Sequence, residues 1–151
     1  MKKKQASANV FFLLFLFIFI LITTITVEFY HIFTVKEYID TELSRAVNIA
    51  VDSAMLDEYR MEHISMIHIP TAKDTFQSYL HTEMELNASN ERIENGKTVY
   101  KLLIGDTVIE NNPVVFTVSG VVRIKPVLLS NLVPVEIDIP FKVRARNQRY
   151  E

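Results

Sequence analysis

The most prominent pattern in the chain is an unbroken apolar stretch from Val10 to Val27. Its 18 residues are five Phe, four Leu, four Ile, two Val and three Thr, without charge, Gly or Pro. At about 1.5 Å per helical residue this stretch is roughly 27 Å long, close to the ~30 Å hydrocarbon core of a bilayer. A core helix that is apolar on all sides would need a large soluble domain around it. The pattern therefore predicts a transmembrane helix within residues 9–30.

The helical period continues beyond this stretch, but only on one face. Apolar residues recur at steps of three or four, as on one side of an amphipathic helix. We call them the α-stripe: Ile32, Val35, Ile39, Leu43, Ala46, Ala50 and Ala54. Because no Gly or Pro interrupts residues 9–69, we predict one continuous helix from about Ala8 to about Tyr59. The α-stripe is a predicted helix-packing interface, and it can pack either on the chain's own C-terminal sheet or on neighbouring copies of the helix.

A second, shorter helix is predicted after Pro70. Thr71 is placed to cap it and Asp74 to serve as the acidic residue of a capping box. Its apolar positions continue to about Leu86.

From Glu91 onward the apolar period changes from 3.6 to 2, which predicts β-strands. Asn95-Gly96 is the preferred pair of a two-residue hairpin turn. Gly105-Asp106 and Asn111-Asn112-Pro113 are the next predicted turns.

Two further strands are predicted at the C-terminal end, within 114–125 and 135–146. The second contains Pro140 and follows Pro134, and a proline cannot donate a ladder hydrogen bond, so we expect this strand at an edge or with an interrupted ladder. The connection between the strands is apolar; it could touch the membrane or a partner, or fold over the core. Its apolar residues are Leu128, Leu129, Leu132 and Val133.

These elements predict an α+β fold. A single N-terminal transmembrane helix continues into a long amphipathic helix, followed by a second short helix and a C-terminal antiparallel β-sheet. The expected organisation is a cytoplasmic N-terminus (1–8), a transmembrane signal anchor (9–30) and one extracytoplasmic domain (31–151).

Charge predicts the orientation. Lys2, Lys3 and Lys4 precede the span, and positive flanks stay in the cytoplasm. Residues 28–151 carry 13 basic and all 18 acidic residues, a formal charge of 13 − 18 = −5. We therefore expect a single-pass cell-membrane protein with its C-terminal domain outside, in contact with the lipid bilayer and without a nucleic-acid-binding surface.

The inventory of reactive side chains points away from catalysis. The chain has no Cys, which excludes disulfides, Cys-ligated zinc and a thiol nucleophile. His63 and His68 are five residues apart, unlike the i, i+4 pair of a helical zinc site. We expect no enzyme activity, no catalytic residue, no cofactor and no metal site, and we identify no small-molecule substrate.

The N-terminal part resembles a known family. Val27-Glu28-Phe29-Tyr30, then Val35-Lys36-Glu37-Tyr38-Ile39 and the Ala-bearing helix at 45–54, are similar to the TadE-type pseudopilins of tight-adherence pilus systems, which have a Val-Glu-Phe element before an Ala-rich helix. The resemblance covers roughly residues 1–55 and implies a pilin-like plan. Because prepilins are usually cut after a Gly and the first Gly here is Gly96, we infer absent or unusual processing and a minor or assembly component.

Pattern and resemblance together lead to a functional hypothesis. The chain is expected to be a structural or assembly component of a bacterial surface pilus or secretion apparatus. Its partners would be copies of itself or other subunits of that apparatus. The alternative is a membrane-tethered extracytoplasmic domain that binds or senses a ligand.

Overall fold

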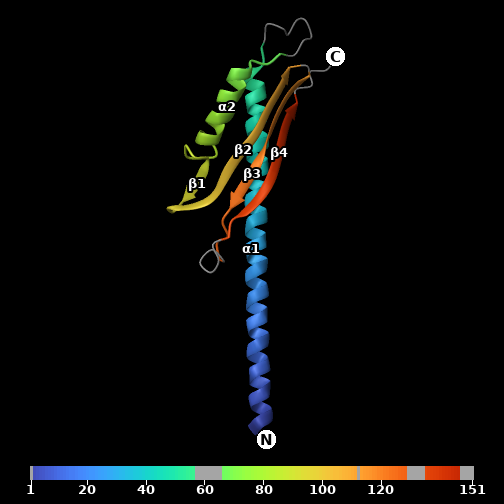
Figure 1. The fold of residues 1–151 in the computed structure, drawn as a ribbon, viewed down its shortest axis with the longest axis vertical. Coiled ribbons are helices and arrows are strands. Elements are labelled where there is room, and N and C mark those ends of the chain that lie inside the picture. The colour runs from blue at the N-terminus through green and yellow to red at the C-terminus, as the bar shows by residue number, and fades with distance from the viewer. Residues whose placement is uncertain (1, 57–65, 112, 129–134, 147–151) are drawn as a thin grey trace.

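The computed structural model describes residues 2–56, 66–111, 113–128 and 135–146, and of residues 2–8 only the backbone. Within these residues the fold is α+β, as predicted, with a long N-terminal apolar helix, a short helix and a four-stranded antiparallel sheet (Figure 1). The elements are α1 (Lys2–Ala54), α2 (Ile69–Thr82), β1 (Glu91–Glu94), β2 (Lys97–Asn111), β3 (Val114–Ile124) and β4 (Ile137–Arg146).

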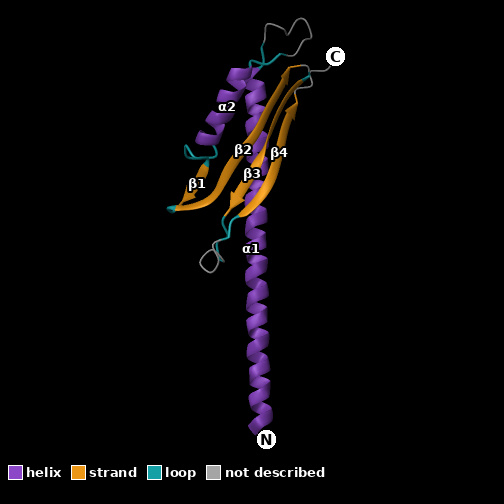
Figure 2. Ribbon diagram, in the orientation of Figure 1, coloured by secondary structure: helices purple, strands orange, loops and turns teal. Residues whose placement is uncertain are grey.

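Helix α1 dominates the shape of the molecule. It has 53 residues, which corresponds to about 80 Å at the standard rise per residue. In Figure 2 its N-terminal part projects alone, while α2 and the sheet lie along its C-terminal part. Residues from Asn9 onward include a window apolar and long enough to cross a membrane, and none of that window is buried in the protein.

The end of α1 corrects the predicted boundary at Tyr59. The helix stops at Ala54 because the chain then pairs with a later segment. The Leu56 N–H donates to the Met66 carbonyl (3.1 Å), and the His68 N–H donates to the Ala54 carbonyl (2.9 Å). These bonds replace the next helical turn.

Helix α2 starts earlier than predicted, and the predicted cap at Thr71 is wrong. Pro70 lies inside its first turn, where the missing N–H costs nothing. The N-cap is His68, whose Nδ1 accepts from the Thr71 N–H (3.4 Å). An imidazole nitrogen thus takes the role that we assigned to the capping box with Asp74.

Helix α2 also ends before the predicted Leu86. Its last residue is Thr82, and Glu83 follows as the C-cap. Glu85 then adopts a left-handed conformation with φ 52°, which turns the chain. The Leu86 N–H donates to the Leu80 carbonyl (3.0 Å) and so closes the helix end.

The sheet is a simple meander in the order β1-β2-β3-β4. The Asn95-Gly96 hairpin is confirmed, with φ 51° and 73°, both in the left-handed region that such a turn needs. The turn predicted at Gly105-Asp106 is wrong, because β2 runs through it as a bulge. Between Ile104 and Thr107 the register with β3 shifts, and the extra residue moves the inward set of β2 from even to odd positions.

Strand β4 is an edge strand, as predicted from its prolines. It pairs with β3 alone, and Pro140 stands opposite Val121. Its alternation places Phe141, Val143 and Ala145 in the core and exposes the residues between them. Pro134 lies outside the described residues.

The core lies where α1, α2 and one face of the sheet meet. Phe76 of α2 and Phe116 of β3 pack edge to face at its centre, with ring centroids 5.6 Å apart. Helix α1 contacts α2, β3 and β4. The largest fully buried side chains are Phe76, Phe116, Ile39, Leu43, Leu80, Met84, Leu102, Ile124, Val47, Val114, Val118 and Val122.

Gly120 of β3 provides a sharp test of this packing. A Cβ at this position would overlap the Leu103 carbonyl oxygen and come within 2.9 Å of the Phe141 ring. At Gly105 the nearest atom, the Ser119 carbonyl oxygen, is 3.3 Å away. We expect Gly120→Ala to lower the free energy of unfolding by about 1–3 kcal/mol and Gly105→Ala to cost clearly less.

The measurement is guanidinium unfolding of the full chain in mild detergent, in which the near-ultraviolet circular dichroism of the tyrosines reports the folded fraction. Equal losses in the two variants would contradict the close approach of β2, β3 and β4 at Gly120.

Candidate functional site

The site of interest lies where α1 passes from its apolar stretch into the folded part. Glu28 is the only Asp, Glu, Lys or Arg between Lys4 and Lys36. Its side chain is nevertheless buried, with 4% of the residue exposed. A carboxylate in this position needs partners, because an unpaired buried charge is very costly.

Those partners come from the loop after β3. Glu28 Oε1 accepts a hydrogen bond from the Val127 N–H (2.6 Å), and Oε2 accepts one from the Leu128 N–H (2.8 Å). Hydrogen bonds to charged groups contribute about 1.5–3 kcal/mol each. We call this arrangement the Glu28 clamp. It ties the loop at the base of the sheet to α1.

The local sequence explains why these two N–H groups are available. Strand β3 ends at Ile124, and the Lys125 N–H makes a last, long bond to the Val99 carbonyl of β2 (3.5 Å), so the residues that follow are beyond the ladder. Pro126 then turns the chain without an N–H of its own. Two successive N–H groups face α1, and a carboxylate offers two acceptor oxygens to match them.

An apolar groove adjoins the Glu28 clamp. Its volume is about 250 Å³, and we call it the junction groove. One wall comes from α1 and the other from the base of the sheet. Its lining residues are Ile25, Glu28, Phe29, Ile32, Pro126, Val135 and Ile137.

Exposed apolar side chains surround the junction groove. On α1 these are Phe29, Tyr30 and Phe33, each more than half exposed. On the loop side Val127, Leu128 and Val135 are also exposed. Leu129, Leu132 and Val133, which the sequence also placed in this connection, lie outside the described residues. The base of the domain is therefore apolar on both sides of the groove.

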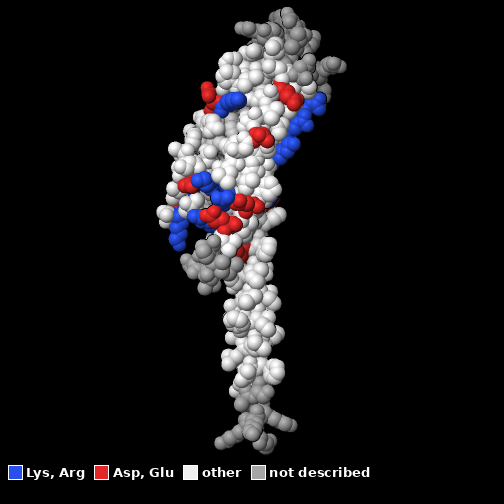
Figure 3. Space-filling model, viewed as in Figure 1, with Lys and Arg blue, Asp and Glu red and all other residues white. Residues whose placement is uncertain are grey.

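Charge appears immediately beyond this apolar base. Lys125 Nζ and a Glu136 oxygen are 3.5 Å apart, and Arg123 forms two hydrogen bonds with Asp138 at 2.8 and 3.0 Å. The Arg123 guanidinium lowers the pKa of the Asp138 carboxyl. In Figure 3 the described part of the projecting helix carries no coloured charge, whereas both signs cover the folded part.

A second polar cluster joins the two helices. The Tyr79 hydroxyl of α2 donates to Glu42 Oε2 of α1 (2.7 Å), and Glu42 Oε1 accepts from Arg45 (2.8 Å). Burial, followed by the hydrogen bond to Glu42, raises the pKa of Tyr79 from 10.0 to about 12. The contact joins α2 to α1. It is a structural contact.

Two buried polar atoms have no hydrogen-bond partner among the described residues. They are His31 Nε2 and the Tyr100 hydroxyl. Burial raises the pKa of the Tyr100 phenol. The described residues include no group of three or more His, Cys, Asp or Glu that could hold a metal ion.

The structure assigns the α-stripe to the chain's own core. Ile39, Leu43, Ala46, Ala50 and Ala54 are at most 3% exposed, and Ile32 and Val35 are partly buried against the same core. Of the two options for its packing, the structure therefore gives the chain's own sheet, with α2. Within the described residues Ile39, Leu43, Ala46, Ala50 and Ala54 present almost no surface to a neighbouring copy.

The other residues singled out from the sequence are the three N-terminal lysines and two histidines. Lys2, Lys3 and Lys4 belong to the first turn of α1, and only their backbone is described. His63 lies outside the described residues. His68 is engaged as the cap of α2.

Sequence reasoning missed the Glu28 clamp. Its signal was present, because one carboxylate at the end of an uncharged run requires a partner. What the sequence did not contain was the position of the β3–β4 loop, which depends on the whole sheet.

Comparison of the chain with protein-family models, with curated proteins and with solved structures found no match.

Glu28→Gln tests the clamp. The amide keeps one acceptor oxygen but presents an NH₂ to the second N–H, so one bond is lost. We expect amide exchange at Val127 and Leu128 to accelerate by about tenfold or more, in line with the loss of about 1.5–3 kcal/mol. Hydrogen–deuterium exchange of the peptide containing these residues is the measurement.

The matched control is Glu37→Gln, since Glu37 is an exposed carboxylate on the same helix. Unchanged exchange in Glu28→Gln, or equal acceleration in both variants, would contradict the Glu28 clamp.

The Tyr79 contact predicts a pH dependence. A pKa raised from 10.0 to about 12 stabilises the fold fully below pH 10.0, and this contribution is lost as the pH rises toward about 12. We expect the free energy of unfolding to fall less steeply over this range in Tyr79→Phe than in the wild type. Denaturant unfolding from about pH 9 to about pH 12 measures it.

Tyr30→Phe is the control, because Tyr30 is an exposed tyrosine of α1. If Tyr79→Phe and Tyr30→Phe showed the same slope, the link between Tyr79 and Glu42 would be refuted.

Proposed function

We propose that the chain is a membrane-anchored structural or assembly component of a bacterial surface pilus or secretion apparatus, similar to a minor pilin or pseudopilin. One observation supports this most: α1 is a single helix, and its two parts have different surroundings. One face of the C-terminal part is buried in the α+β domain, and the apolar N-terminal part is not covered by any described residue. An apolar rod rigidly fixed to a folded domain is suited to lateral packing with similar rods.

The proposed orientation has the N-terminus in the cytoplasm and the domain outside the membrane. The three lysines at 2–4 support it, because positive residues flank the cytoplasmic end of a span. The net negative charge of residues 28–151 is compatible with export.

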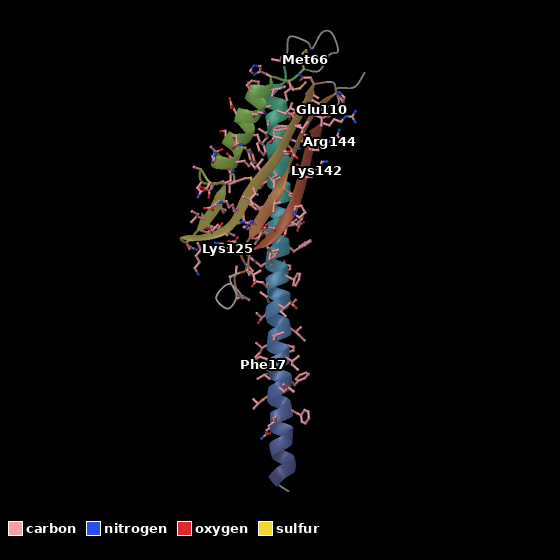
Figure 4. All side chains as sticks on the ribbon, viewed as in Figure 1. Phe17, Met66, Glu110, Lys125, Lys142 and Arg144 are labelled. Carbon is pink, nitrogen blue, oxygen red and sulfur yellow. The ribbon has the colours of Figure 1, made fainter. Side chains whose placement is uncertain are left out.

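Association would use the projecting part of α1, because the α-stripe is already buried. Figure 4 labels Phe17 on this part, far from the sheet. The hydroxyls of Thr23, Thr24 and Thr26 each donate to a carbonyl of their own helix at 2.9 Å. With these hydroxyls engaged and no charge in the stretch, packing between copies or with other subunits depends on shape and aromatic contacts.

Cysteine scanning tests the proposal, since the chain has no cysteine of its own. Single cysteines are placed from Phe11 to Ile22 in the full chain and crosslinked in native membranes. We expect multimers or adducts with other subunits, with yields that recur at the helical period of about 3.6 residues. Yields without such a period would indicate random collision and contradict a specific interface.

Two controls come from the structure. Leu43→Cys is fully buried in the core and should not crosslink. Val108→Cys is exposed on the sheet and measures collision between neighbouring domains. If the scan yields no more product than Val108→Cys, the assembly proposal fails.

A second function has one observation in its favour. The junction groove could serve a membrane-tethered binding domain that acts as a monomer. A scan without specific crosslinks, together with a monomeric chain in mild detergent, would favour this alternative.

A further inference from the structure

We propose that the junction groove holds an acyl chain of a membrane lipid, so that the base of the sheet is a second membrane contact beside α1. The inference rests on membrane anchoring by α1 and does not require the assembly role. Its occupant follows from the position of the groove, its chemistry and its size.

The position follows from the helix register. Ile25 lines the groove and also belongs to the apolar stretch 10–27, and Phe29 lies one turn further. This stretch is roughly 27 Å long against a hydrocarbon core of ~30 Å. The groove therefore opens at the boundary of the hydrocarbon and is continuous with the surface that α1 presents to lipid. In Figure 1 the end of β3 and the start of β4 lie at the end of the sheet nearest the projecting helix.

The chemistry of the groove favours an apolar occupant. Six of its seven lining side chains are apolar: Ile25, Phe29, Ile32, Pro126, Val135 and Ile137. The seventh is Glu28, and both of its oxygens already accept backbone N–H groups. A ligand entering the groove therefore meets mainly hydrocarbon, and the one polar side chain already accepts two hydrogen bonds.

The size favours part of a long molecule. A volume of about 250 Å³ is below the ~300–1,000 Å³ of usual small-molecule sites. A segment of an alkyl chain fits this space while the rest of the lipid stays in the bilayer. A compact, self-contained ligand would be only partly enclosed.

The surface around the groove changes from apolar to charged with distance from the projecting helix, as expected at a membrane boundary. Phe29, Tyr30 and Phe33 form an exposed aromatic group at the end of the apolar stretch, where membrane proteins place such rings. On the loop, Val127 and Leu128 are exposed and apolar. The pair Lys125–Glu136 follows immediately, so charges begin where the headgroups would lie.

The Glu28 clamp gives this contact a fixed geometry. A carboxylate near the hydrocarbon is tolerated only with partners, and here the partners are the backbone N–H groups of the exposed apolar residues Val127 and Leu128. The clamp thus holds Val127 and Leu128 at the level of the membrane boundary.

Photolabelling tests the proposal on the full-length protein in vesicles. The vesicles consist of phosphatidylcholine with a diazirine in one acyl chain, and adducts are mapped by mass spectrometry. Labelling of residues 10–24 is the internal reference for the span. We expect adducts at Pro126 and Ile137 as well.

A matched pair of variants isolates the groove. Val135→Trp places a large ring in the groove, whereas Val108→Trp adds the same ring at an exposed site of β2 near Glu110, which Figure 4 labels toward the other end of the sheet. We expect Val135→Trp to lower labelling at Pro126 and Ile137 several-fold without changing the reference. Val108→Trp should change neither.

The same variants are fluorescent reporters, because the chain has no native Trp. Lipids with brominated acyl chains should quench Val135→Trp and leave Val108→Trp unquenched. Adducts confined to the span, or equal access of acrylamide to both rings, would overturn the proposal. So would protection of Val135→Trp that depends on the protein-to-lipid ratio without bromine quenching, since a second copy would then cover the groove.

The outcomes separate this inference from the assembly proposal. Groove labelling in a chain without specific crosslinks would retain lipid docking and reject assembly. Specific crosslinks from the span without groove labelling would do the reverse.

Discussion

The structure depends on covering one face of α1 with protein. From Ile39 to Ala54 the α-stripe is buried by α2, β3 and β4. The sheet is a single layer, so without α1 and α2 one face would be open to water. Burial of about 25 cal/mol per Å² of apolar surface makes this the main stabilising term of the domain. The apolar N-terminal part of α1 is not covered by the described residues, and its length and composition fit a membrane anchor.

The elements with a strong local signal could be predicted from sequence. The unbroken apolar run, the Asn95-Gly96 turn and the alternation of β3 and β4 all depend on neighbours within a few residues. Boundaries set by distant contacts could not. The end of α1 is fixed by pairing with Met66, and the Gly105-Asp106 bulge depends on the register with β3. Glycine followed by aspartate is typical of a turn, and only the partner strand shows that it is a bulge here.

The candidate site also has a part that could be predicted from the sequence and a part that could not. The α-stripe was identified from its period, but the period did not say whether protein of the same chain or another copy covers it. Glu28 was visible as one carboxylate at the end of an uncharged run, and its partners come from a loop about a hundred positions later. A capping histidine, as at His68, is also invisible in the sequence pattern, because imidazole is not among the usual N-cap side chains.

The edge strand β4 affects whether the sheets of neighbouring membrane-anchored copies can pair edge to edge. Anchored domains share one plane, where exposed sheet edges of neighbouring copies meet more often than in solution. Pro140 interrupts the row of donors on the free edge, and Lys142, Arg144 and Arg146 stand exposed along the strand. Two such edges would repel each other and could not form a complete ladder. The sheet is thereby protected from fusing with its neighbours into a continuous ribbon.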